Sequence, residues 1–540
     1  MNESHNKEEK FGAERSKSEK NEGNDVVDGV NIKSLRRVGE RVPLPSWIII
    51  LIEFCERFAF RGGVITFMNY AKYPYHHKKP AGALGKGQTT AYALKQVFAL
   101  VCYIWPLCLG IICDQYWGKY KSILFSCCLF IVGWSLLTLT AIPPALEAGA
   151  GLPGYCIGLV IVACGSGGIK SLVQPMAADQ FQMDKMKVKE VKGEMVVVDP
   201  EINSRQVYHY FMCVMQAGSL IGGVISPYIE SRVGFWLCFL FPAVLTMLST
   251  TLFFTCRDKY VKVPPTGNSA LVKLFRCYMY GRKRRNASNP KPSSALECAK
   301  TNAPSGVPPE TEEDKVKKTW DDEFVDNARE TLNACKILAP TIVWALGNNQ
   351  VTSSLVSQAA SMNRPSPTMS FPTLMYVVYP TLERLNIPFR PMKRMVVGFM
   401  LGGLGMASSA IIQDQIHRHK ANHLPEISVW WQLITYFLMG LSEIFVMVTP
   451  LEYCYTRTPQ SMKGLVAAVY LLPYAGATLI DLALSSVSQR VWTYGGFSIA
   501  NGVMSILFWY YFGHIDREDE KRAKAQALRA QMVDDEKAKV

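Results

Sequence analysis

Apolar runs of about 20 residues recur along most of the chain, with short polar segments between them. A helix of that length spans the hydrocarbon core of a bilayer, which is about 30 Å thick. These runs therefore predict an all-α membrane protein, because only helices satisfy their own backbone groups over so many consecutive apolar residues. Twelve such runs can be separated: 46–70, 91–113, 121–143, 153–175, 207–229, 233–255, 337–360, 371–386 (interrupted by Pro372 and Pro380), 393–416, 427–450, 463–485 and 490–513.

The charged residues make up 19% of the chain and are concentrated outside these runs. They predict a polar tail at 1–45, a bundle of six helices at 46–255, a linker at 256–336, a second six-helix bundle at 337–513 and a tail at 514–540. The linker is rich in proline and serine, so we expect it to be flexible. Two six-helix bundles are typical of transporters whose substrate site lies between the halves.

Lysine and arginine are more numerous in one set of loops than in the opposite set. Because basic loops are retained on the cytoplasmic side, both termini and the linker are predicted to be cytoplasmic. The first outer loop is an exception, with Lys72, Lys78, Lys79 and Lys86. The net charge of +14 follows from this basic bias, so no nucleic-acid partner is expected.

The first apolar run, 46–70, carries Glu53, Glu56, Arg57 and Arg61 near its middle. Each charge at a bilayer midplane costs roughly 2.5–3.5 kcal/mol. Helical spacing places 53, 57 and 61 on one face with Glu56 at its edge, so these charges can pair and face a polar cavity. A titratable face inside the membrane predicts a transport pathway, and the alternative is an ion-pair cluster that only holds helices together.

The sequence contains no motif of an enzyme: GxSxG, Walker A, HExxH and a strand-to-helix GxGxxG are all missing. The fifteen cysteines lie mostly inside apolar runs and form no CxxC pair or Cys/His ligand pattern. We therefore expect neither catalysis, nor a metal, nor an organic cofactor.

Two motifs resemble known families. The segment DQYWGKYKS, Asp114–Ser122, resembles a loop of the major facilitator superfamily, in which an aspartate–basic network gates the cytoplasmic side. That resemblance makes Asp114, Lys119 and Lys121 the gating candidates. The segment EFCERFAFRGG, Glu53–Gly63, resembles the ExxERFxYYG motif of the proton-coupled oligopeptide transporter family.

Further segments resemble motifs of the same transporter family, in the same order along the chain. They are GSGGIKSLVQPMAADQF (Gly165–Phe181), the fifth-run segment Gly193–Leu220, WALGNNQVTSSLVSQAASM (Trp344–Met362) and LSEIFVMVTPLEYCYTRTPQSMKG (Leu441–Gly464). The sequence of the third segment, Trp344–Met362, and the long linker are similar to those of fungal members of the family. The resemblance implies the major facilitator fold and a multi-pass plasma-membrane symporter, acting as a monomer, that imports di- and tripeptides with protons.

The resemblance also assigns roles. In the family, the positions matching Arg57 and Lys170 bind the peptide carboxylate, and the position matching Glu443 attracts the amino terminus. Glu53, Glu56 and Arg57, together with Lys170, form the proton-coupling group. This is physically reasonable, because two acids beside a shared cation titrate together. Further expected substrate-binding positions are Arg61, Tyr103, Gln216 and Trp344.

Several pocket positions depart from the family pattern. Arg61 stands where relatives carry tyrosine, and an added cation one helical turn from Arg57 should favour anionic or acidic ligands. Alternatively, Arg61 extends to the outer surface or pairs with Glu56 and leaves the pocket unchanged. The other departures are Phe60, Ser171, Met212, Gln216 and Phe371.

Two other functions remain open at this stage. One is import of a different anionic solute, such as nitrate or a modified amino acid. The other is a peptide sensor that does not transport. Asp481, a further acid inside the eleventh run, has no role in the family pattern.

Overall fold

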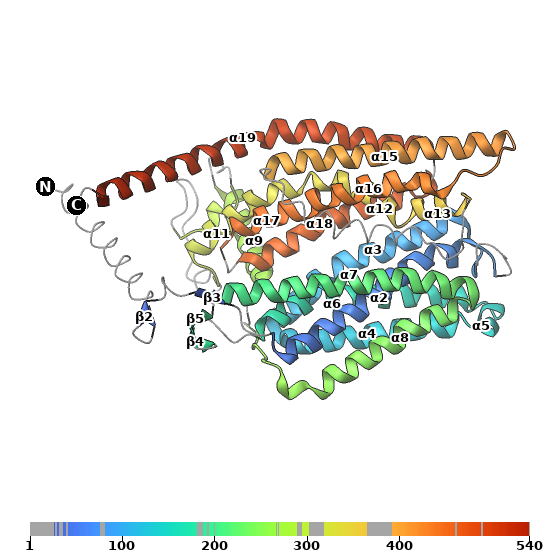
Figure 1. Cartoon of the computed structure of the whole chain (residues 1–540), viewed down its shortest axis with the longest axis horizontal. Helices are drawn as coiled ribbons and strands as arrows, with labels where there is room; N and C mark the ends of the chain where they lie inside the picture. The colour runs from blue at the N-terminus through green and yellow to red at the C-terminus, as the bar shows by residue number, and fades with distance from the viewer. Residues whose placement is uncertain are drawn as a thin grey trace.

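A computed structural model describes residues 26–27, 30–31, 36–38, 42–75, 82–180, 187–191, 194–198, 200–265, 267, 269–288, 294–301, 318–363, 391–459, 462–487 and 490–538. They form a bundle of long, nearly parallel helices in two halves lying side by side (Figure 1).

The first half follows the first six apolar runs. Its helices are α2 (Leu44–Lys72), α3 (Gly87–Ile112), α4 (Gly118–Thr140), α6 (Gly151–Asp179), α7 (Pro200–Arg232) and α8 (Phe235–Thr255), with the short α5 (Pro143–Glu147) between α4 and α6. A π-helical turn, η2 (Cys113–Trp117), joins α3 to α4.

The second half contains α12 (Thr341–Val351), α13 (Ser354–Ala360), α15 (Pro391–Ala421), α16 (Gln432–Glu443), α17 (Thr449–Thr456), α18 (Lys463–Ala483) and α19 (Val491–Ala538). A second π-helical turn, η7 (Ile444–Val448), joins α16 to α17. The predicted eighth run, 371–386, lies outside the described residues, whereas the other eleven predicted runs fall on helices.

Within the described residues, seven helical stretches are long and apolar enough to cross a membrane. The helix α2 is not among them, although it lies in the middle of the first half. Its charges, which lower its hydropathy, are therefore placed among other helices rather than against lipid.

The close approach of α7 to α2 depends on glycine. A Cβ atom added at Gly218 would lie 2.6 Å from the carbonyl oxygen of Phe54, and one added at Gly222 would overlap the carbonyl oxygen of Phe58. Small residues of this kind allow membrane helices to pack backbone to backbone. The contact fixes the turn of α2 that carries the charged residues.

Each half has its own apolar core. In the first half, the ring of Phe67 packs against Trp134, Tyr155 and Phe239, with centroids 5.7–6.0 Å apart. In the second half, a separate buried cluster includes Trp344 and Phe399. Because the cores are separate, the halves can move relative to each other without either core being exposed.

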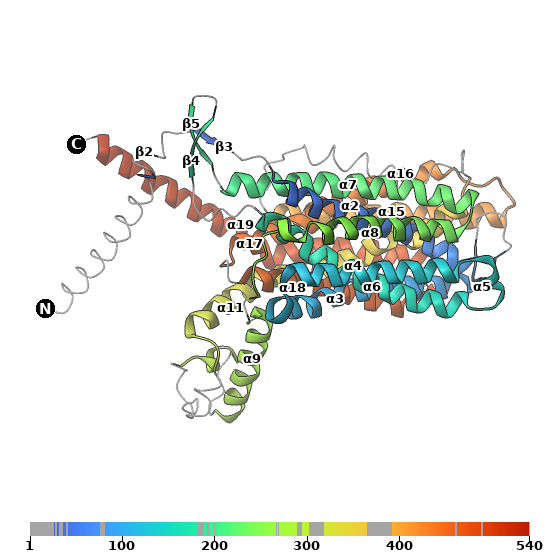
Figure 2. The same ribbon diagram turned by 90° about the horizontal axis from the view of Figure 1, so that it is seen from below.

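A small sheet lies at the end of the bundle where both termini are found (Figure 2). The strand β5 (Glu194–Val198) pairs antiparallel with β4 (Lys187–Val191) and parallel with β3 (Arg36–Val38). A separate two-residue pair joins β1 (Val26–Val27) to β2 (Val30–Asn31). The apolar pattern did not predict these strands, because they lie in polar segments outside the spans.

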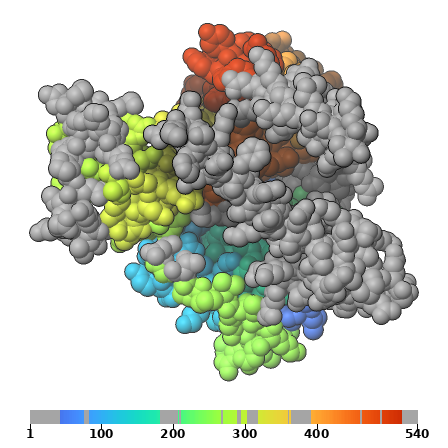
Figure 3. All heavy atoms as spheres, turned by 90° about the vertical axis from the view of Figure 1, so that its left-hand side faces the viewer, coloured from blue at the N-terminus to red at the C-terminus, as the bar shows by residue number. Residues whose placement is uncertain are grey.

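The expectation of a flexible linker is wrong for much of 256–336. This segment forms α9 (Ala270–Ala287) and α11 (Asp322–Cys335), which project from the side of the bundle at the end of the termini (Figures 2 and 3). We call residues 270–288, 294–301 and 318–335 the lateral unit.

The lateral unit is ordered because it has a small core of its own. Cys277 and Val325 are buried in one cluster with Met462 and Leu465, which lie at the start of α18. The guanidinium of Arg284 is also buried and donates a 2.7 Å hydrogen bond to the carbonyl of Cys298. The lateral unit is therefore attached to the second half.

Candidate functional site

Three charged residues of α2 form an ion-pair cluster inside the first half. Arg57 Nε lies 2.6 Å from Glu53 Oε1, one helical turn earlier, and 3.4 Å from Glu56 Oε2. Both glutamates are almost completely buried, whereas the Arg57 side chain keeps 22% of its surface exposed. The cluster thus has a buried acidic side and an accessible cationic side.

Helix α6 supplies the rest of the cluster. Ser166 Oγ donates a 2.5 Å hydrogen bond to Glu56 Oε1, and Lys170 Nζ lies 3.5 Å from the same oxygen. Ser166 and Lys170 are four residues apart and so share one face of α6. The structure therefore brings together all four residues of the predicted proton-coupling group: Glu53, Glu56, Arg57 and Lys170.

Phe60, one of the departures from the family pattern, also contacts this cluster. The ammonium of Lys170 lies 3.0 Å from the centroid of the Phe60 ring. A cation over a ring face is stabilised by roughly 0.5–2 kcal/mol, more when desolvated. Phe60 therefore helps to hold Lys170 in place.

Each buried glutamate keeps one oxygen without a hydrogen bond from the described residues: Glu53 Oε2 and Glu56 Oε2. A carboxylate only accepts hydrogen bonds, and a protonated carboxyl group also donates. A proton on Glu53 Oε2 or Glu56 Oε2 would therefore displace no hydrogen bond among these residues, although on Glu56 Oε2 it would weaken the 3.4 Å ion pair with Arg57 Nε.

Glu443 of the second half faces this region from α16. It is half-buried at the last residue of α16, next to the π-helical turn η7, an irregularity that is frequent at functional sites. Glu443 interacts electrostatically with Arg61 of α2. Arg61, which is also half-buried, therefore faces the other half of the protein.

Aromatic side chains lie between the cluster and the second half. The ring of Tyr103 on α3 lies 5.6 Å from that of Tyr474 on α18, and the Tyr470 and Tyr474 hydroxyls are 3.1 Å apart. Trp344 is fully buried and donates from Nε1 to Ser442 Oγ at 2.7 Å. Trp344 therefore supports the turn of α16 that carries Glu443.

Sequence analysis did not include Tyr470, Tyr474 or Ser442 in the site. The two tyrosines stand at i and i+4 in an apolar run, a spacing that puts both on one helix face. Gln216, which was predicted to bind substrate, is half-buried on α7, and among the described residues no hydrogen bond joins it to the cluster. Phe371 lies outside the described residues.

The gating candidates lie at the end of the bundle where the termini are found. Lys119 Nζ is 2.5 Å from Asp179 Oδ2 at the end of α6, an acid that the sequence analysis did not assign. Asp114 interacts electrostatically with Lys119, while Lys121 is exposed. Gly118 allows the turn between α3 and α4, with φ of 71°.

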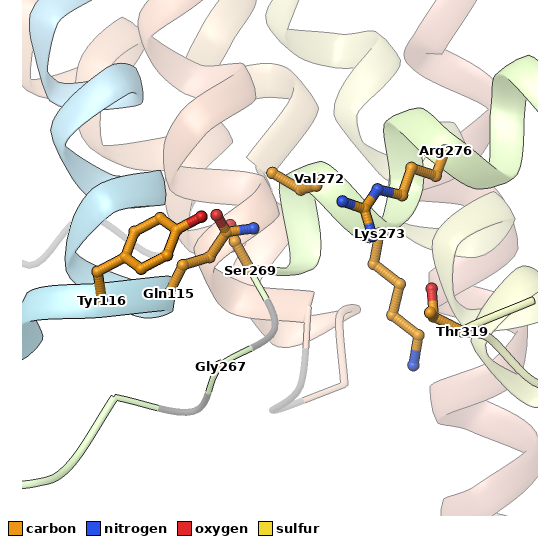
Figure 4. A pocket seen from close by; sticks show the side chains of 8 residues that line it. All are labelled: Gln115, Tyr116, Gly267, Ser269, Val272, Lys273, Arg276 and Thr319. Carbon is orange, nitrogen blue, oxygen red and sulfur yellow. The ribbon is translucent and has the colours of Figure 1, made fainter. Parts of the chain in front are cut away.

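The segment leading into the lateral unit contacts the same turn. The backbone N–H of Gly267 donates a 3.1 Å hydrogen bond to the carbonyl of Asp114. Gln115 and Tyr116 lie across a small hollow from Ser269 and Lys273, which belong to the start of α9 (Figure 4). The lateral unit thus reaches the first half at this turn while it is packed on the second half.

A second buried charge cluster lies outside the predicted site. Lys95 of α3 is only 4% exposed and Asp481 of α18 is not exposed at all. Among the described residues, no group of three or more His, Cys, Asp and Glu side chains is arranged to hold a metal ion.

Comparison with known proteins decides the family. A profile of the POT family matches residues 120–498. The chain belongs to the POT family. A probable peptide transporter of Schizosaccharomyces pombe is 31% identical over 517 residues, covering 91% of this chain and 81% of the relative. A peptide transporter of Candidozyma auris, PTR_C, is 32% identical over 519 residues, covering 91% and 87%.

Solved structures have the same fold. The crystal structure of an auto-inhibited POT family peptide transporter superposes with a TM-score of 0.65 at 20% identity, covering 87% of this chain and 96% of that one. A POT family transporter crystallised in meso gives 0.64 at 22% identity, covering 87% and 98%. The expected family and all-α membrane fold are thus confirmed, and this POT family member is a multi-pass membrane transporter rather than an enzyme.

Proposed function

We propose that this POT family member imports di- and tripeptides together with protons by alternating access. The observation that carries the proposal is the placement of opposite charges on the two halves. Arg57 and Lys170 belong to the first half and Glu443 to the second. A zwitterionic peptide between the halves needs a cation near its carboxylate and an anion near its ammonium group, and these residues offer both. The names of the fungal relatives support a peptide as the substrate.

Glu56 is proposed as the residue that couples proton and substrate. Its Oε1 is shared by Ser166 and Lys170. While Glu56 is ionised, it holds the Lys170 ammonium beside it. Protonation of Glu56 would remove that attraction and free Lys170 for a substrate carboxylate. A peptide and a proton would then bind together, with no other cofactor required.

We further propose that the protein works as a monomer in the plasma membrane with both termini cytoplasmic. The basic loops support this orientation. In this orientation, the end of the bundle away from the termini is the outer end. There Ser357 Oγ on the second half donates to Gln88 Oε1 on the first half at 2.9 Å. The outer end is thus joined across the halves.

The test is uptake by cells that lack their own peptide transport and express this chain. We expect labelled dialanine to enter faster as external pH falls, because the coupling carboxylate must be protonated from outside. A protonophore should stop accumulation. As a specificity control, nitrate and single amino acids should not compete. Dialanine accumulation that is unchanged by the protonophore would contradict proton coupling. Binding of dialanine without uptake would identify a sensor.

A further inference from the structure

Lys95 and Asp481 are buried charges that the proposed peptide and proton sites do not use. They come from opposite halves, on α3 and α18, and these two helices pack against each other. Each charge inside a membrane helix costs roughly 2.5–3.5 kcal/mol, so such residues are rare and usually functional. Neither residue is needed to fill an apolar core.

The second half provides polar groups for both charges. Lys95 Nζ donates to Thr352 Oγ1 at 2.7 Å, just beyond the end of α12. Asp481 accepts hydrogen bonds from Asn349 Nδ2 at 2.8 Å and from Gln350 Nε2 at 3.0 Å. The opposite charges of Lys95 and Asp481 attract each other through space, and among the described residues no direct ion pair joins them. Each charge is therefore balanced by groups that lie mostly on the second half.

Among the described residues, few titratable groups surround this network. Gln350 also donates to the hydroxyl of Tyr92 on α3, at 2.8 Å. The positive charge of Arg61 on α2 repels that of Lys95. Tyr494 on α19 interacts electrostatically with Tyr92. Among these groups, Asp481 is the carboxylate that balances Lys95.

Because the network lies between the two halves, opening of the outer end separates its charged groups. If the outer end opens, Lys95 leaves with the first half, while Asp481, Asn349, Gln350 and Thr352 remain on the second. An ionised carboxylate separated from its cation in this environment is costly, and uptake of a proton from the outer solution removes that cost. Lys95 keeps its own proton and is hydrated through the open mouth.

We propose that Lys95 and Asp481 form the ionic gate of the outer end, and that protonation of Asp481 from outside releases it. The proton returns to the outer solution when the gate closes, so this step adds nothing to the protons carried with substrate. The gate rests on the proposed function only in that it regulates the same transporter.

The test is hydrogen exchange of the purified protein in lipid nanodiscs, which requires no substrate. Asp481→Asn mimics the protonated acid, so at about pH 7 the start of α3, residues 87–95, should exchange at least about threefold faster than in the wild type. Lys95→Gln should act in the same direction. The double variant Lys95→Asp with Asp481→Lys swaps the two charges and should restore slow hydrogen exchange.

A matched control is Asp516→Asn. Asp516 is also buried but caps α15 within the second half, so its loss should leave exchange at 87–95 unchanged. If Asp481→Asn does not fold, Lys95→Gln and the double variant still decide the matter. The gate would be overturned if the single variants exchanged hydrogen at the wild-type rate at 87–95. It would also be overturned if the double variant with swapped charges did not restore slow hydrogen exchange. If Asp481→Asn speeds hydrogen exchange at 87–95 while the protein carries no dipeptide into cells, the gate stands and only the proposed substrate is wrong.

Discussion

The buried ionic groups of the first half and those at the interface differ in what a rocking motion does to them. Glu53, Glu56, Arg57 and Lys170 all lie on α2 and α6, so they move as one body. The opposite charges of Lys95 and Asp481, and those of Arg61 and Glu443, lie on different halves, so their attraction is lost whenever the halves separate there.

This difference separates two tasks that transport requires. A cluster inside one half keeps its geometry through the cycle, so only a proton or a substrate changes its charge balance. A pair across the halves exists in some conformations and not in others, so any ligand that neutralises one member shifts the conformational equilibrium. The first arrangement suits coupling and the second suits gating and selection.

The strongest test of the comparison is Glu56→Gln, inside the first half. With an inward gradient of about one pH unit, one coupled proton supports roughly tenfold accumulation of a neutral substrate. The variant cannot carry the proton on this residue, so we expect accumulation to fall to equilibration while exchange of labelled for unlabelled dipeptide continues. Counterflow and accumulation assays measure the two separately.

Glu147→Gln is the matched control, because Glu147 is an exposed acid in the first half. Its accumulation should equal that of the wild type. Normal accumulation by Glu56→Gln would show that another group couples the proton. The assignment of coupling to the cluster inside the first half would then be wrong.

Glu443→Ala tests the interface and should have the next largest effect. Removing one member of a buried charge contact costs about 2–5 kcal/mol, and because Glu443 is half-buried we expect the lower end, about thirtyfold in affinity. The loss should be confined to peptides with a free amino terminus and be small for N-acetylated ones. Competition against labelled dipeptide gives both affinities.

Glu452→Ala serves as the control, since Glu452 is 60% exposed and pairs with Arg394 away from the interface. It should leave both affinities unchanged. Equal losses for free and blocked peptides in Glu443→Ala would remove Glu443 from the amino-terminal site.

Arg61→Tyr should have the smallest effect. In the structure Arg61 interacts with the same glutamate that a peptide ammonium group would need, so the wild type should prefer acidic or other anionic ligands to neutral dipeptides. The variant should shift that preference toward neutral dipeptides by about 1 kcal/mol, or roughly fivefold. A competition series of neutral, acidic and basic dipeptides measures it.

Arg61→Lys, which keeps the charge, should retain the wild-type ranking. In the double variant Arg61→Tyr with Glu443→Ala, the two effects should not add, because each removes the partner of the other. An unchanged ranking in Arg61→Tyr would mean that Arg61 does not select ligands.

Much of the first-half cluster could be predicted from local spacing. Glu53 and Arg57 are one turn apart, and the GSGGIK segment supplied Lys170 by resemblance. Ser166 was not assigned, because a serine in a glycine-rich stretch is usually explained by helix packing. Lys95 and Asp481 were harder, since nothing in the spacing of either one indicates a partner on the other half.

The linker shows a different limit. Its average composition, rich in proline and serine, hid a helix whose buried residues Phe324, Val325 and Ala328 follow helical spacing. That spacing was present in the sequence, but it became informative only once Met462 and Leu465 were known to cover this face.

The last helix, α19, extends well beyond the bundle. As a single helix of 48 residues, α19 is about 72 Å long, so about 40 Å extend past a hydrocarbon core of about 30 Å. In Figure 1 this overhang leaves the bundle at the end of the termini. A rotation of the second half by roughly 15° would swing its tip by about 10 Å, which magnifies a small internal tilt into a displacement that a fluorophore fused to the C-terminus can register.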